Sequence, residues 1–121
     1  MLSPYQDVAE LLLTLKNCVV LTGAGISAES GVRTYRGDDG LWTSEGAAAM
    51  SKATLAYFSR HPERSWQWHL DRRSEVLAAE PNPAHRALHA LERRLDERHL
   101  GFTLVTQNVD DLHERAGSSP L

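Results

Sequence analysis

The sequence predicts an α/β fold in which helices flank a parallel sheet. Two short apolar runs, residues 18–21 and 102–105, are rich in valine and leucine. Continuous runs of this kind are typical of parallel strands that are covered on both faces. The long segment between them has apolar residues at helical spacing, and a parallel pair of strands requires such a crossover. Together these observations indicate an α/β architecture.

A first helix is expected over residues 3–15, ahead of the first strand. Ser3 can cap this helix, Pro4 fits its first turn, and Gln6 completes a capping box. Its apolar positions repeat every three or four residues and make one face, consisting of Val8, Leu11, Leu12 and Leu15. The helix is therefore expected to be amphipathic.

The segment between the strands is expected to be mostly helical. A short helical stretch, Ile26–Ser30, follows the first strand. Residues 31–53 lack clear periodicity, which indicates a long loop with short helical pieces, and long loops in compact domains are often binding loops or lids. Further helices are expected over residues 54–80, with a break near His61–Pro62, then from Asn82–Pro83 onward, and from Asp110 to Arg115.

The composition is that of one ordinary globular domain, residues 1–121. The chain is 41% hydrophobic and 24% charged, with a formal net charge of −3. It is not basic enough to indicate nucleic acid as a main partner, and its longest apolar run is too short for a membrane span. No signal peptide is evident, so the expected location is cytoplasmic. The single cysteine, Cys18, excludes a four-cysteine zinc site, and no metal site is expected.

A glycine-rich loop follows the first strand directly. Residues 23–28 read Gly-Ala-Gly-Ile-Ser-Ala, which fits G-x-G-x-x-A between a strand and a helix. Glycines there allow a tight turn and let a pyrophosphate contact the backbone, while the helix N-terminus offers free N–H groups. The pattern predicts a Rossmann-like nucleotide site, although a glycine-rich turn without a ligand remains an alternative. A Rossmann enzyme that transfers hydride carries an acidic residue at the end of a second strand, about 20 residues further on. No such strand end is evident here, which argues against hydride transfer.

Two longer motifs carry a family resemblance. Residues 23–36, which read GAGISAESGVRTYR, are similar to the first signature of the sirtuin family. Residues 106–110 read TQNVD, which matches the second, and the resemblance continues through residues 112–118. Both motifs occur in the family order, and the resemblance covers residues 15–121. It implies the N-terminal, NAD-binding part of a sirtuin-like domain, with an incomplete Rossmann-like sheet and no zinc module.

The resemblance implies an NAD-dependent protein-lysine deacylase, of deacetylase or desuccinylase type, that forms nicotinamide and O-acyl-ADP-ribose from NAD and an acyl-lysine protein. Asn108 and Asp110 would take part in catalysis. The residues that the resemblance assigns to the cofactor are Gly23, Ala24, Gly25, Ile26, Ser27, Thr34, Tyr35, Arg36, Gln107, Asn108 and Asp110. Without the resemblance, Asp110 reads equally well as a cap for the next helix.

A subtype is indicated by Thr34, which stands where many sirtuins have aspartate. This resembles the subgroup that removes acidic acyl groups, in which a Tyr-x-x-Arg pair on one helix face binds the acyl carboxylate. Here His69 and Arg72 occupy those positions, so a weaker preference for acidic acyl groups is expected. Alternatively, Trp66, Trp68 and His69 are ordinary core and surface residues of a helix.

The family's general-base histidine is expected a few residues beyond Leu121, as are the zinc module and later strands. We therefore expect the 121-residue chain to be inactive by itself. One alternative is a non-catalytic module that binds NAD or ADP-ribose, and another is an NAD hydrolase. An unpaired strand at the sheet edge would also favour self-association.

Overall fold

The computed structural model describes residues 3–36 and 40–121, so residues 37–39 of the predicted loop lie outside the described part. The elements in chain order are α1 (Pro4–Thr14), β1 (Asn17–Thr22), the 3-10 helix η1 (Ala24–Ser30), α2 (Leu41–Ser44), α3 (Gly46–Lys52), α4 (Leu55–Arg60), α5 (Pro62–Ala78), α6 (Pro83–Asp96), β2 (Gly101–Thr106) and α7 (Leu112–Ala116). Every strand and helix expected from the sequence is present, with ends shifted by a few residues.

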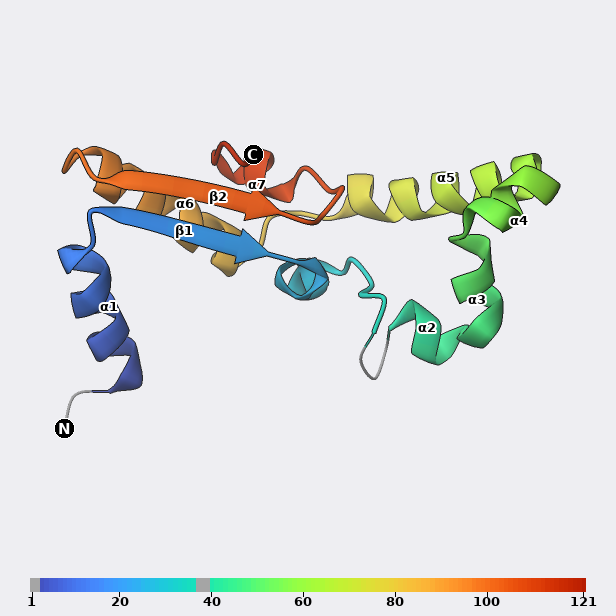
Figure 1. Ribbon diagram of the computed structural model, residues 1–121, viewed down its shortest axis with the longest axis horizontal. Helices are drawn as coiled ribbons and strands as arrows, with labels where there is room; N and C mark the ends of the chain where they lie inside the picture. Colours follow the sequence, from blue (N-terminus) through green and yellow to red (C-terminus); the bar gives the residue numbers. More distant parts are fainter. Residues whose placement is uncertain (1–2, 37–39) are drawn as a thin grey trace.

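The two strands pair in parallel, which confirms the predicted α/β class (Figure 1). Asn17 lies opposite Gly101, and Thr22 lies opposite Thr106. Helix α6 packs against β2 and α7 and covers one face of the pair. Leu95 of α6, Leu104 of β2 and Leu112 of α7 are almost completely buried there and form the core. This core fixes the sheet against the helices that precede and follow β2.

The other face of the sheet is open, contrary to the expectation that residues 18–21 are covered on both sides. Cys18 and Thr22 are buried, whereas Val19 is 70% exposed and Leu21 is 64% exposed. Successive side chains of a strand point to opposite faces, and the described helices cover only one of them. The apolar face of α1 is also uncovered at Val8 and Leu11.

Local sequence signals account for the helix boundaries. Pro62 begins α5 directly after α4, because proline has no N–H to continue the previous helix but fits a first turn. The Asn82 side chain caps α6 by accepting the N–H groups of Ala84 and His85 at 2.9 and 3.4 Å. Gly31, with a φ of 85°, ends η1 in a left-handed conformation. None of the described helices combines the length and apolar character needed to span a bilayer.

Helices α2 to α5 form an arc at the carboxyl end of the strands (Figure 1). α2 and α3 are the short helical pieces expected within residues 31–53, and α4 and α5 are the two helices expected on either side of His61–Pro62. Helix α5 extends away from the sheet, so its C-terminal half lies nearest the strand ends. The arc therefore brings a remote part of the chain to the edge where β1 and β2 end.

The open sheet face leads us to expect self-association of the 121-residue chain. The described sheet contains only β1 and β2, and Leu121 N–H donates at 2.8 Å to the carbonyl of Leu104, on the edge of β2 that points away from β1. Replacing Val19 and Leu21 together with threonine keeps strand propensity but removes exposed apolar surface. Analytical ultracentrifugation should show average mass rising with concentration, less steeply for the double variant. Val109→Thr, at a 95% exposed residue outside the sheet, is the control. A wild-type mass that does not depend on concentration would contradict this expectation.

Candidate functional site

The parallel register places the two sequence motifs side by side. The carboxyl ends of β1 and β2 reach the same edge of the sheet, where Thr22 Oγ1 donates to Thr106 Oγ1 at 2.9 Å. The pairing continues one residue further, because Gln107 N–H donates to the Thr22 carbonyl at 3.0 Å. The glycine loop after β1 and the segment after β2 therefore leave the sheet together. Open α/β sheets bind ligands at this position.

Side-chain hydrogen bonds join the two loops. Ser27, which is completely buried, donates from Oγ to Asp110 Oδ2 at 2.9 Å. The Asn108 amide donates to the carbonyl of Gly23 at 3.1 Å and to Ser27 Oγ at 3.2 Å. Asp110 Oδ1 also accepts the Leu112 N–H at 3.3 Å, at the start of α7. Asp110 thus supports the next helix, as its alternative interpretation required, while its other oxygen faces the loop of the first motif.

Two adjoining cavities lie beside these loops. The smaller, of about 110 Å³, is lined by seven of the residues singled out from the sequence: Ala24, Ser27, Tyr35, Arg72, Gln107, Asn108 and Asp110. The larger, of about 490 Å³, is lined by His69 and Trp68 and shares Tyr35 and Arg72 with the smaller one. Small-molecule sites usually occupy about 300–1,000 Å³. A ligand of dinucleotide size would therefore extend beyond the smaller cavity.

Several residues assigned to the cofactor do not line the smaller cavity: Gly23, Gly25, Ile26, Thr34 and Arg36. A Cβ atom at Gly25 would meet no atom within 4 Å, so neighbouring atoms do not require glycine there. The missing side chain instead leaves the loop backbone open to a ligand. η1 is a 3-10 helix of seven residues, so its dipole is weaker than that of a long α-helix. Any anion at this loop would therefore be held mainly by hydrogen bonds from the loop N–H groups.

The segment after η1 is stacked on an aromatic residue that the sequence interpretation did not include. The Arg36 guanidinium lies 4.8 Å from the centre of the Trp42 ring. The centres of the Tyr35 and Trp42 rings are 5.2 Å apart. Thr34 Oγ1 donates to the Arg36 carbonyl and holds the turn between them. Stacking of this kind orders Arg36 and also Tyr35, which lines both cavities, while leaving both side chains exposed. Trp42 follows the tight turn of the motif, where no periodic pattern marked it.

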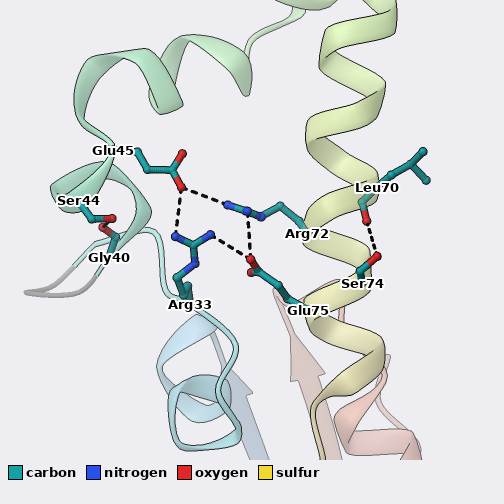
Figure 2. A network of polar contacts seen from close by, with 8 residues as sticks. All are labelled: Arg33, Gly40, Ser44, Glu45, Leu70, Arg72, Ser74 and Glu75. Atoms are coloured by element: carbon teal, nitrogen blue, oxygen red, sulfur yellow. Dashed lines mark hydrogen bonds and ion pairs between the residues drawn. The ribbon is translucent and has the colours of Figure 1, made fainter.

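Four charged side chains form a closed ring between the loop and α5 (Figure 2). Arg33 contacts Glu45 at 3.1 Å and Glu75 at 3.0 Å. Arg72 contacts the same two carboxylates at 3.4 and 3.0 Å. The hydrogen bond to Glu75 is the main cause of a raised pKa of Arg33. Only the Arg72–Glu75 pair has a sequence spacing that predicts contact, so sequence analysis missed the ring.

Two histidines are buried behind the loops. The rings of His85 and His113 lie 4.8 Å apart, and His113 Nε2 is 2.9 Å from Thr22 Oγ1. His85 Nδ1 accepts the N–H of Asn82 at 3.3 Å. Burial, followed by the nearby His113, lowers the pKa of His85, and Asp110 only partly opposes this shift. In the part of the chain that the structure describes, no three histidine, cysteine, aspartate or glutamate side chains gather as metal ligands.

The environment of His85 makes stability depend on pH. The pKa of His85 in the folded state lies below the value of 6.5 for an exposed histidine. The contribution of neutral His85 to the free energy of unfolding is therefore complete above pH 6.5. As the pH falls below 6.5, the unfolded chain takes up the proton first, and stability is lost. We expect the midpoint of thermal unfolding to fall between pH 7.5 and 5.5, less steeply in His85→Asn. The exposed His99 has a φ of 58°, which asparagine tolerates, so His99→Asn is a matched control. Equal pH dependence in wild type and His85→Asn would contradict this.

Comparison with known proteins assigns the family. The model of the Sir2 family matches residues 23–121. An NAD-dependent protein deacylase 1 from Pseudomonas aeruginosa is 51% identical over 112 residues, covering 92% of this chain and 42% of that protein. A mitochondrial NAD-dependent protein deacylase sirtuin-5 from Xenopus tropicalis is 43% identical over 119 residues, covering 98% of this chain and 38% of that protein. The crystal structure of a Sir2 homolog–NAD complex superposes with a TM-score of 0.74 at 42% identity, covering 95% of this chain and 43% of that one. The chain thus spans less than half the length of these relatives, and it belongs to the Sir2 family.

Proposed function

We propose that this chain is the NAD-binding part of an NAD-dependent protein-lysine deacylase, which forms nicotinamide and O-acyl-ADP-ribose. The observation that carries the proposal is the joining of both motifs at one strand edge. Ser27 of the first motif bonds Asp110 of the second at 2.9 Å, beside a cavity that both motifs line. The relatives named as NAD-dependent protein deacylases and the NAD complex of a homologue support this assignment.

The polar groups at the cavity suit a dinucleotide. The open backbone at Gly25, with Gly23 and Ala24, would face the diphosphate, and the exposed Arg36 would supply positive charge. Gln107 and Asn108 would hydrogen-bond the ribose hydroxyls, and the backbone hydrogen bonds at the strand ends hold both segments in place. Bound NAD would supply the bond between nicotinamide and ribose that the reaction breaks. The protein's part is to orient that bond toward the acyl group and to exclude water.

Three of the remaining assigned residues would shape the nicotinamide end. Ile26 has its carbonyl fixed by the Asn82 amide at 2.7 Å, and Asp110 is buried against Ser27. Tyr35 lies between the two cavities and would cover the reacting ribose face. Thr34 acts on this region through its hydrogen bond to the Arg36 carbonyl. Positioning of this kind raises the rate only if these groups stay ordered, which their hydrogen bonds and stacking favour.

The acyl group of a modified lysine would enter the larger cavity. His69 and Arg72 both line it, together with the apolar residues Trp68, Val76, Leu77 and Val109. These apolar side chains suit the methylene groups of an acyl-lysine, and Tyr35 connects this cavity to the smaller one. The proposed partner is therefore an acyl-lysine protein.

A second candidate is a module that binds NAD or ADP-ribose without catalysis. It is favoured by the environment of the two histidines that lie behind the motifs. His85 and His113 are almost fully buried, and neither lines the cavities beside the two motifs. Neither is therefore placed to take a proton from a ribose hydroxyl, whereas all the proposed binding residues are present.

We expect Asn108→Ala to weaken NAD binding by about threefold to tenfold, because one or two hydrogen bonds at the loop are lost. Isothermal titration calorimetry with NAD on the 121-residue chain measures this effect. Asn17→Ala makes the same change at the opposite end of β1 and should bind NAD like the wild type. Equal affinities of wild type and Asn108→Ala would remove Asn108 from the site.

We expect the 121-residue chain to turn over an acetyl-lysine peptide with NAD at least about 10²-fold more slowly than a chimera. In the chimera, residues 1–121 are joined to the remaining part of the Pseudomonas relative. A general base is worth about 10²–10⁴-fold, and no histidine lines the cavity between the motifs here. Ser27→Ala should lower the activity of the chimera. Comparable turnover by the chain and the chimera would contradict the need for a residue outside 1–121, and an inactive chimera would contradict the proposed function.

A further inference from the structure

Both terminal nitrogens of Arg72 already contact a carboxylate. Its Nη1 lies 3.4 Å from Glu45 and its Nη2 lies 3.0 Å from Glu75 (Figure 2). Its Nε is buried and, among the described residues, has no hydrogen-bond partner, so a ligand does not reach it. The side chain is 24% exposed and lines both cavities. Any anion that approaches Arg72 therefore meets nitrogens that two carboxylates already hold.

The two carboxylates are held differently. Glu75 is three residues from Arg72 on the same helix, so their contact depends only on α5 itself and not on how α5 packs against other elements. Glu45 comes from the junction of α2 and α3, and its contact with Arg72 is the longest in the ring. Arg33 orients Glu45 from the other side at 3.1 Å. Glu45 is thus the carboxylate with which an incoming anion would compete most directly for Arg72.

The ring also cancels the local charge. Two arginines and two glutamates make it neutral, so the net positive field that would attract an anionic group toward Arg72 is weak. Asp111 adds a carboxylate to the lining of the larger cavity, although it also pairs with Arg115 at 3.0 Å. A neutral acyl group displaces no ion pair, and it meets the apolar side chains of the same cavity.

We propose that Glu45 is a specificity-determining residue: its carboxylate holds Arg72 and restricts the larger cavity to acyl groups without negative charge. This inference rests on the proposed function, because it assigns the acyl class taken by the same site. An intramolecular carboxylate acts at a high effective concentration, so a succinyl carboxylate competes for Arg72 at a disadvantage. Acetyl and other neutral acyl groups are unaffected.

The test compares two small probes on the 121-residue chain. They are Nε-succinyl-lysine and Nε-acetyl-lysine, both blocked at the backbone and titrated by NMR, with the Trp68 indole N–H beside Arg72 as the reporter. The wild type should bind the succinyl probe no more tightly than the acetyl probe. Glu45→Gln should strengthen succinyl binding by about fivefold to tenfold, the scale of one charge-assisted hydrogen bond near the surface, and should leave acetyl binding unchanged.

Controls separate this effect from net charge and from folding. Glu63→Gln makes the same change of charge at an exposed position of α5 and should bind both probes like the wild type. Adding Arg72→Gln to Glu45→Gln should abolish the gain, because the gain acts through Arg72. Glu45→Ala repeats the experiment without an amide that could still bond Arg72. Circular dichroism and NAD titration on each variant verify the fold and the cofactor site.

Three results would overturn the inference. If the acetyl probe binds but Glu45→Gln and Glu45→Ala do not gain succinyl affinity, Glu45 does not set the preference, and the proposed function stands. If the wild type prefers the succinyl probe by tenfold or more, Arg72 is available despite the ring. If NAD binds but neither probe binds any variant, the larger cavity is not the acyl site and the inference fails with it. Failure of NAD binding alone would instead contradict the proposed function.

Discussion

The parallel pairing of β1 with β2 is the constraint on which the candidate site depends. Its register sets Thr22 beside Thr106, and the hydrogen bond from Gln107 to the Thr22 carbonyl extends it to the strand ends. Two loops that are far apart in the sequence then share one edge, where their polar groups can meet. A slip of one residue would turn every side chain of one strand to the opposite face and separate Ser27 from Asp110. The position of the site therefore depends on the pairing of the two strands.

Buried polar groups make that arrangement specific. Ser27, Asp110 and Asn108 satisfy one another's hydrogen bonds, which matters because an unpaired polar group costs far more in the interior than in water. The same residues would contact a dinucleotide, so packing and proposed binding are not separable roles here. Behind them, His85 and His113 are buried with their rings 4.8 Å apart, and burial lowers the pKa of His85.

The charged ring of Arg33, Glu45, Arg72 and Glu75 orients the segments that it connects more than it stabilises the fold. Its four side chains are 24–36% exposed, and ion pairs with that degree of solvent contact add little to stability. They do connect three segments, because Arg33 follows η1, Glu45 joins α2 to α3, and the other two members are on α5. The loop at the cavity mouth and the helix that lines the larger cavity are therefore oriented together. Both carboxylates that contact Arg72, Glu45 and Glu75, lie outside the two sequence motifs.

The sequence by itself determined the two strands, the helix order, the break at Pro62, the capped start of α6 and the family, because apolar periodicity, proline, cap residues and contiguous motifs act locally. Only the tertiary structure decided which sheet face is covered, that Ser27 bonds Asp110, and that Trp42, His85 and the ring surround the site. The open face at Val19 and Leu21 depends on which helices pack nearby, and strand composition does not carry that information. Arg33 and Glu45 meet Arg72 across segments far apart in the chain, and a charge in a sequence does not specify its partner until the chain has folded.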